Sequence, residues 1–132
     1  LQLDKNLPAI VGVADQLTQV FMNLMINAMD ASISVNGENE TIQLETQQDG
    51  DRVQISITDR GHGMSKEIQN HILEPFFSTK PVGKGSGLGL SICDSIVHTH
   101  GGVLNIDSEE GKGTTFHVFL PIDLIDSEII NR

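Results

Sequence analysis

ADQLTQVFMNLMINAMDASISV, residues 14–35, is predicted to form a long helix because apolar side chains recur at helical spacing. The positions that set this pattern are Leu17, Val20, Phe21, Leu24, Ala28 and Ala31. Further apolar residues surround the helix almost completely, and Asn23 and Asn27 interrupt them on one face. Two interpretations remain open: the asparagines bond to neighbouring backbone, or they line a cavity where amide oxygens suit Mg²⁺.

The composition indicates one acidic domain. The chain has 132 residues, is 38% hydrophobic and has a formal net charge of −10. We expect no nucleic-acid binding, because neutralising phosphates requires a basic surface. The one cysteine, Cys93, lies in an apolar run and is expected to be a buried small hydrophobe rather than a reactive thiol.

We expect neither a signal peptide nor a membrane span in this sequence. No apolar run approaches the ~18 residues of a membrane span. We therefore expect no membrane contact by this domain and a cytoplasmic location. The chain begins with Leu1 rather than Met, which favours a piece of a longer protein, and that longer protein can itself be membrane-anchored.

Period-two alternation predicts two hairpins. The first joins strands at residues 41–48 and 52–59 through a DGD turn, and the second spans residues 103–121 and turns through EEGKG. An extended start precedes the first helix. Hairpin strands with helices on one side predict an α+β fold, a two-layer sandwich.

Two more helices are predicted between the hairpins. The first covers residues 65–73, with Ser65 as its N-cap. A loop over residues 74–87 leads into the second helix, which is predicted over residues 86–102 and ends in a glycine pair typical of a C-cap.

The motif Asp59-x-Gly61-x-Gly63 follows directly on a predicted strand. A carboxylate at a strand end can accept a hydrogen bond from an exocyclic amine such as N6 of adenine. The glycines allow backbone and a flat ring to approach closely. Taken alone, the motif also fits an ordinary turn.

GKGSGLGLSI, residues 83–92, places alternating glycines at a helix start. Unpaired N–H groups and the positive end of the helix dipole suit a polyphosphate there. The Walker A signature is absent. Lys80 and Lys84 are placed to meet phosphate charge, or are simply solvated. The preceding loop, with Phe76 and Phe77, is typical of a lid.

Four motifs in this order resemble the N, G1, F and G2 boxes of sensor histidine kinase catalytic domains: NLMINAMDA, DRGHGMS, EPFFSTK and GKGSGLGLSI. These domains belong to the GHKL, or Bergerat-fold, ATPases, together with HSP90, type II topoisomerases and MutL. The resemblance covers about residues 3–121 of a single domain, residues 1–132, and is closest to the nitrogen-regulatory and PAS-linked branch. It implies a mixed sheet with helices on one face and a flexible ATP lid.

The resemblance implies ATP and Mg²⁺ as ligands. It assigns the metal to Asn27, with Asn23 as an accessory amide one turn earlier. Many relatives carry a basic residue where this sequence has Asp30. One phosphate contact is therefore in doubt, and a lid lysine can supply that charge.

The resemblance also implies that Asp59 binds the adenine base and that Thr114 helps to hold the base through a water molecule. The other implied nucleotide contacts are Gly61, Gly63, Phe76, Lys80, Lys84, Gly85, Ser86, Gly87, Leu88 and Gly89.

Asn23 also separates kinase from hydrolase chemistry. HSP90, topoisomerases and MutL carry a glutamate there that activates water, whereas an amide cannot act as a general base. The resemblance implies slow hydrolysis and transfer of the γ-phosphoryl to a histidine on a separate dimerisation domain, then to a response regulator. None of the five histidines lies in the acceptor motif of that family, so no catalytic residue is assigned within this chain.

Two other functions remain open. One is a serine kinase of the anti-sigma-factor type with the same fold. The other is a degenerate domain that only docks partners, although every nucleotide-contacting position named above is intact.

Overall fold

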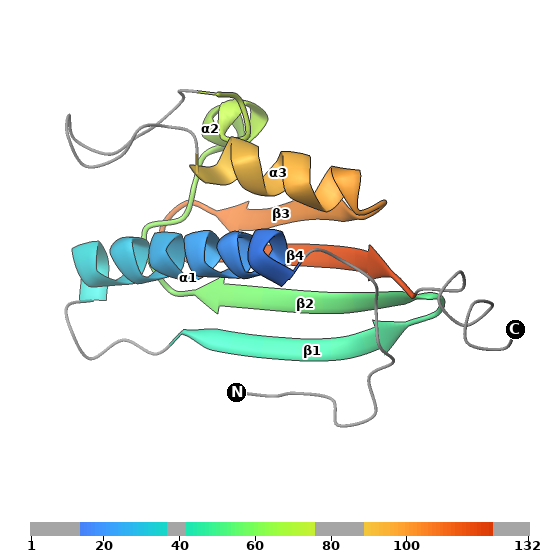
Figure 1. The fold of residues 1–132 in the computed structure, drawn as a ribbon. Helices are drawn as coiled ribbons and strands as arrows, with labels where there is room; N and C mark the ends of the chain where they lie inside the picture. Colours follow the sequence, from blue (N-terminus) through green and yellow to red (C-terminus); the bar gives the residue numbers. More distant parts are fainter. Residues whose placement is uncertain (1–13, 37–41, 76–88, 123–132) are drawn as a thin grey trace, which may run out of the picture.

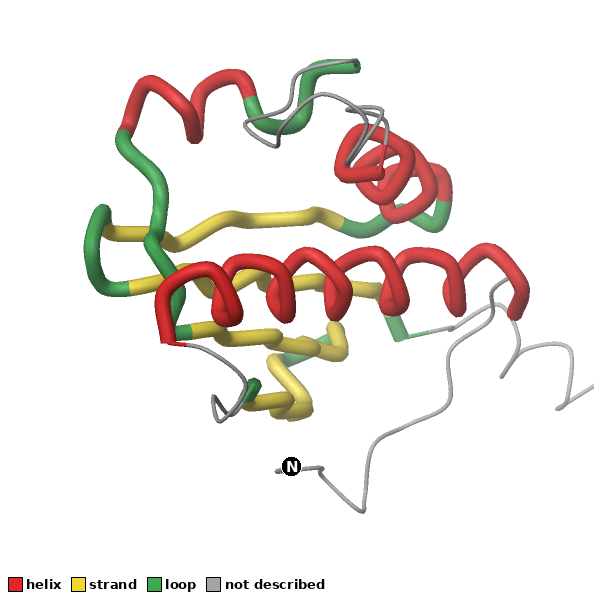
Figure 2. The backbone as a smooth tube through the Cα atoms, turned by 90° about the vertical axis from the view of Figure 1, so that its left-hand side faces the viewer, coloured by secondary structure: helices red, strands yellow, loops and turns green. Residues whose placement is uncertain are grey.

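The structure is a computed structural model that describes residues 14–36, 42–75 and 89–122 (Figure 1). The described helices and strands follow the predicted order, with one helix, two strands, two helices and two strands. Their bounds are α1 Ala14–Asn36, β1 Gln43–Asp49, β2 Arg52–Asp59, α2 Lys66–His71, α3 Gly89–Thr99, β3 Val103–Glu109 and β4 Gly113–Pro121. Helices α1 and α3 lie on the same side of the sheet, so the predicted α+β two-layer sandwich is confirmed (Figure 2).

The four strands form one sheet in the order β1-β2-β4-β3. Every pairing among these described strands is antiparallel. The mixed sheet implied by the family resemblance is therefore wrong for this part of the chain. Two tight hairpins account for the β1–β2 and β3–β4 pairings, because strands joined by a short turn pair antiparallel. The central pairing of β2 with β4 is also antiparallel, although a long segment separates these strands in the chain. The extended start expected before α1 lies outside the described residues.

The core lies between the sheet and helices α1 and α3. Val20, Leu24 and Ala28 of α1 have no exposed surface, as their helical spacing predicts. Alternate residues of the strands and one face of α3 meet them; the fully or nearly buried ones are Ile57, Cys93, Val97, Phe116, Val118 and Leu120. Cys93 is thus a buried small side chain, as predicted.

Two predicted helix caps are confirmed, although α2 ends at His71 and α3 at Thr99, a few residues before the predicted ends. Ser65 is the N-cap of α2, and its hydroxyl accepts a hydrogen bond from Ile68 N. Helix α3 ends at the glycine pair, where Gly101 has φ +77° and Gly102 N donates to Val97 O. The predicted start of this helix at residues 86–88 lies outside the described residues.

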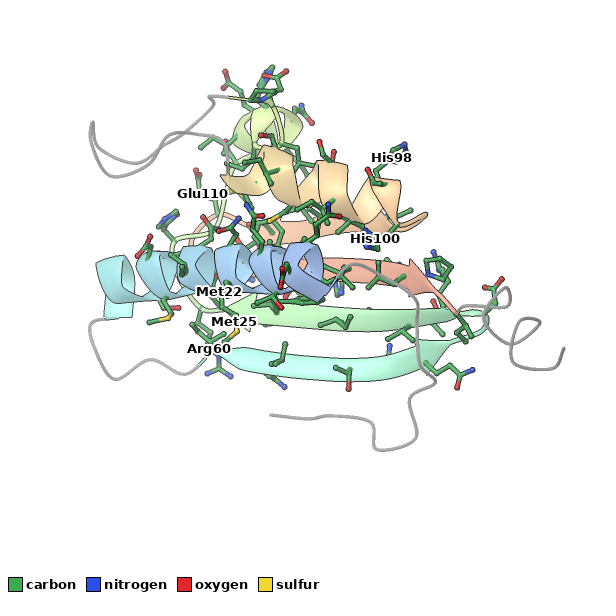
Figure 3. The ribbon with its side chains drawn as sticks, in the orientation of Figure 1. Met22, Met25, Arg60, His98, His100 and Glu110 are labelled. Carbon is green, nitrogen blue, oxygen red and sulfur yellow. The ribbon has the colours of Figure 1, made fainter. Side chains whose placement is uncertain are left out.

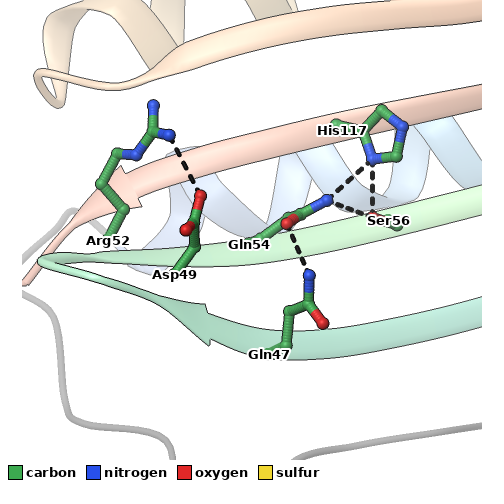
Figure 4. A network of polar contacts seen from close by, with 6 residues as sticks. All are labelled: Gln47, Asp49, Arg52, Gln54, Ser56 and His117. Atoms are coloured by element: carbon green, nitrogen blue, oxygen red, sulfur yellow. Dashed lines mark hydrogen bonds and ion pairs between the residues drawn. The ribbon is translucent and has the colours of Figure 1, made fainter.

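The sheet face away from the helices is polar. Near its centre, His117 Nδ1 contacts Ser56 Oγ at 2.8 Å and Gln54 Nε2 at 3.0 Å, and Gln47 extends the network to β1 (Figure 4). Along this face Arg52 stacks over the Phe119 ring at 4.3 Å. Because side chains alternate along a strand, these groups point away from the buried layer.

The outer side of α1 is apolar but exposed. Met22 and Met25, labelled in Figure 3, are 57% and 37% exposed. Ile26 and Met29 are also exposed, at one-turn spacing from them. The helix is therefore apolar almost all round, as predicted, although only one side of it contributes to the core.

Candidate nucleotide-binding site

Asp59 and Thr114 form the buried centre of the candidate site. They are direct partners in the register between β2 and β4. Only 3% of Asp59 and 6% of Thr114 are exposed. Direct cross-strand partners on one sheet face have Cβ atoms about 4.5–5.5 Å apart. The sheet therefore brings together the two residues to which the resemblance assigns the adenine.

The Asp59 carboxylate also organises the loop that follows it. Its Oδ1 accepts a hydrogen bond from Gly61 N at 2.8 Å. A Cβ atom at Gly61 would lie 2.6 Å from the backbone of Ala31 in α1. Gly61 is thus required for close approach between the loop and α1, one helical turn beyond Asn27.

Gly63 makes a second close approach, to the β3–β4 turn. Its φ is +68°, and a Cβ atom there would lie 2.0 Å from Glu109 O. The prediction that Gly61 and Gly63 admit a flat ring is not tested by these contacts. What they show is that both glycines are needed for backbone-to-backbone packing within the protein.

Hydrogen bonds fasten this loop to the β3–β4 hairpin. Gly111 N donates to His62 O at 2.7 Å, and Met64 N donates to Ser108 Oγ at 2.9 Å. From α2, Gln69 Nε2 donates to both Met64 O and Ser108 O. The carboxylate side and the threonine side of the site are therefore held as one unit.

The two asparagines of α1 are both half-buried. The Cys93 thiol of α3 donates to Val20 O of α1 at 3.6 Å. Burial raises the pKa of Cys93 to about 11, although the Asn23 side chain acts in the opposite direction. Asn23 therefore lies close enough to Cys93 to influence its thiol.

The part of the site that is expected to bind the phosphates lies only partly within the described residues. Gly89 begins α3, and a Cβ atom there would meet nothing within 4 Å. The other residues expected at the phosphates and lid lie outside the described residues: Phe76, Lys80, Lys84, Gly85, Ser86, Gly87 and Leu88. Among the described residues, no three His, Cys, Asp or Glu side chains gather as a metal cluster.

The five histidines are spread over α2, α3, β4 and the loops. His98 is exposed near the end of α3, and His100 Nδ1 is 2.8 Å from Ile96 O (Figure 3). His71 pairs with Glu74, and His117 lies on the open face of the sheet. His62 is exposed, and its Nδ1 is 2.7 Å from Gly63 O.

Two residues of the site were missed from the sequence. Ser108 contacts both Met64 and Thr114, and Gly113 packs so closely that a Cβ atom would lie 2.2 Å from Asp59 O. The register of the second hairpin could have identified both, since a turn at residues 110–112 pairs Ser108 with Thr114.

The sequence matches the family model described as histidine kinase-, DNA gyrase B-, and HSP90-like ATPase over residues 12–124. The chain belongs to this family. Sensor histidine kinase ZraS of Escherichia coli (strain K12) is 40% identical over 118 residues, which cover 89% of this chain and 24% of that protein. Sporulation kinase E of Bacillus subtilis (strain 168) is 38% identical over 122 residues, which cover 92% of this chain and 16% of that protein.

Solved structures support the same assignment. The catalytic domain of histidine kinase ThkA matches with a TM-score of 0.77 at 31% identity, covering 92% of this chain and 76% of that one. The mycobacterial sensor histidine kinase MprB matches with a TM-score of 0.73 at 31% identity, covering 85% and 74%. The fold is therefore that of histidine kinase catalytic domains, and the chain spans about a quarter or less of its relatives ZraS and sporulation kinase E.

Proposed function

We propose that this chain is the ATP-binding catalytic domain of a sensor histidine kinase. It binds ATP with Mg²⁺ and transfers the γ-phosphoryl to a histidine on a separate dimerisation domain of the same protein, for relay to a response regulator. The observation that carries the proposal is the buried Asp59–Thr114 pair, set at the end of the asparagine-bearing helix in a chain of this ATPase family.

Asp59 is suited to bind adenine. Its buried carboxylate can only accept hydrogen bonds, and the exocyclic amine of adenine can only donate them. One carboxylate oxygen is oriented by Gly61 N. The base is thereby held beside α1, so that the phosphates extend toward the start of α3, whose N–H groups favour anions.

Asn27 and Asn23 are the proposed metal residues. Their amide oxygens are neutral donors, and Mg²⁺ commonly keeps several waters while it shares phosphate oxygens. This donor set fits such an ion. When bound, it would neutralise phosphate charge during transfer. Asn27 is half-buried on the face that continues to Ala31 and Gly61, which supports its placement beside the nucleotide.

Transfer rather than hydrolysis is favoured by Asn23. An amide cannot take a proton from water, so the bound nucleotide should persist until an external nucleophile arrives. The relatives named sensor histidine kinases favour histidine over serine as that nucleophile.

Within the described residues, no helix has the length and apolarity that crossing a membrane requires. A cytoplasmic location and the nitrogen-regulatory branch remain proposals.

The test is phosphotransfer in trans. The chain is mixed with Mg²⁺, ATP radiolabelled at the γ-phosphate, and the dimerisation domain of its own full-length protein. We expect label on that domain that is lost in acid and kept in base, as a phosphohistidine requires. Acid-stable label would favour the serine-kinase alternative. Failure of ATP with Mg²⁺ to raise the melting temperature of the chain would favour a docking domain without nucleotide.

A further inference from the structure

Ser108 of β3 joins three groups that surround the base site. Its hydroxyl donates to Gly113 O at 3.0 Å and accepts from Met64 N at 2.9 Å. It also lies 2.7 Å from the hydroxyl of Thr114, its register partner on β4. Neither the sequence motifs nor the proposed nucleotide contacts include this residue.

Counting protons fixes the direction of the Ser108–Thr114 hydrogen bond. A hydroxyl has one proton and two lone pairs, and a carbonyl oxygen can only accept. The proton of Ser108 is used by Gly113 O, and one of its lone pairs by Met64 N–H. The other lone pair must accept from Thr114, so the Thr114 hydroxyl is the donor in this contact.

Thr114 therefore presents lone pairs and no proton to the site. Asp59 lies directly across the strand pair and, when ionised, also offers only acceptors. A base edge placed here meets two acceptors side by side. The 6-amino group of adenine donates, directly or through water, and is satisfied. At the same position the 6-keto oxygen of guanine only accepts, so it would face two acceptors and gain no hydrogen bond there, which disfavours guanine in this orientation.

We propose that Ser108 is a positioning residue for base selection: by accepting the Thr114 proton it keeps Thr114 an acceptor, and so favours 6-aminopurine over 6-ketopurine nucleotides. The inference rests on the proposed function. The inference goes beyond the proposed function, because it assigns part of the adenine preference to a residue that does not contact the base. Without Ser108, the Thr114 hydroxyl can rotate and donate to a 6-keto oxygen.

The experiment measures ATP and GTP dissociation constants, with Mg²⁺, for the 132-residue chain and its variants. We expect Ser108→Ala to lower the preference for ATP over GTP by about fivefold, the effect typical of one neutral hydrogen bond. Ser108→Thr keeps the hydroxyl and should keep the preference. Ser65→Ala removes a serine hydroxyl that caps α2, and should leave the preference unchanged.

A double-mutant cycle separates positioning from loss of stability. In a Thr114→Val background, Ser108→Ala should no longer change the ratio of the GTP and ATP dissociation constants, because Ser108 acts through the Thr114 hydroxyl. A ratio that still falls by the same factor would overturn the inference, as would an unchanged ratio in the single variant. If Ser108→Ala does not fold, Ser108→Cys fills the same space with a weak hydrogen-bonding group, and the same two outcomes apply.

The two levels of proposal fail in different ways. Wild-type chain that binds neither ATP nor GTP would overturn the proposed function and this inference together. Wild-type chain that binds ATP in preference to GTP, with the same preference in folded Ser108→Ala, would overturn this inference alone.

Discussion

Asp59 and Thr114 face each other across the central strand pair, so the candidate adenine site is built on the sheet itself rather than on loops. Each strand is paired along its full length with a neighbour, and the site residues are almost fully buried. Positions on paired strands are held more precisely than positions on free loops. Base recognition in this domain should therefore be preorganised, and changes in the pair should act on affinity more than on folding.

Asp59→Asn is expected to remove most of the adenine preference. The amide keeps the size of the side chain but loses the charge, and it can turn a donor toward the base. A hydrogen bond to a charged group contributes about 1.5–3 kcal/mol, so ATP affinity should fall roughly ten- to hundredfold. Isothermal titration with ATP and GTP measures both constants.

The matched control for this change is Asp51→Asn, in the exposed turn between β1 and β2. It alters the same chemical group far from the site and should leave both constants unchanged. If Asp59→Asn kept the wild-type choice of ATP over GTP, the role of Asp59 in base recognition would be refuted.

Gly63→Ala should destabilise the domain far more than Gly50→Ala. Both glycines have nearly the same positive φ, +63° at Gly50 and +68° at Gly63, so the backbone penalty is shared. A Cβ atom meets nothing within 4 Å at Gly50, but lies 2.0 Å from Glu109 O at Gly63. We expect about 1 kcal/mol for Gly50→Ala and roughly 2–5 kcal/mol for Gly63→Ala.

Urea unfolding monitored by circular dichroism gives both free energies. Nucleotide affinity should fall only for Gly63→Ala, because the loop must move away from the β3–β4 turn. Equal destabilisation by the two variants would mean that backbone conformation, and not close packing, explains Gly63.

The sequence predicted the elements well because each carries its own local signal. The apolar spacing of Val20, Leu24 and Ala28 and the cap at Ser65 depend on residues close in the chain, and the structure places them as expected. The two hairpins were predicted and are confirmed, but the antiparallel pairing of β2 with β4 was not predicted. It depends on which strands become neighbours, and β2 pairs with β4 across a long intervening segment.

The site was predicted in type but not in its internal contacts. Asp59 and Thr114 could be named from motifs, and the strand register brings them together. The hydrogen bond between Cys93 and Val20 O and the hydrogen bonds of Ser108 join residues far apart in the sequence. Such contacts leave no periodic pattern, so only the packed structure reveals them.

Cys93 should make stability depend on pH in the alkaline range. Burial raises the pKa of its thiol from the ordinary value of 9.0 to about 11, so the folded state keeps a proton that the unfolded state releases. The associated stability is fully present below pH 9 and is lost as pH rises toward 11. The loss is about 1.4 kcal/mol per pH unit within that window.

Urea unfolding of wild type and Cys93→Ala at pH 8 and pH 10 isolates this contribution, because the lysines titrate in both proteins. The difference in unfolding free energy between the two proteins should shrink at the higher pH. A constant difference would show that the thiol ionises as readily in the folded chain as in the unfolded one.

Asn27→Ala should abolish the dependence of nucleotide binding on Mg²⁺. The change removes a neutral oxygen donor from the half-buried face of α1 and leaves the helix intact, since alanine is the best helix former. We expect ATP affinity measured with Mg²⁺ to fall to the value measured with a chelator, while binding of adenosine, which has no phosphates, stays unchanged. Asn70→Ala, on the exposed surface of α2, is the matched control and should retain the wild-type Mg²⁺ effect. If Asn27→Ala also retained it, the metal would have to be held by other residues, and the proposed role of the α1 asparagines would be wrong.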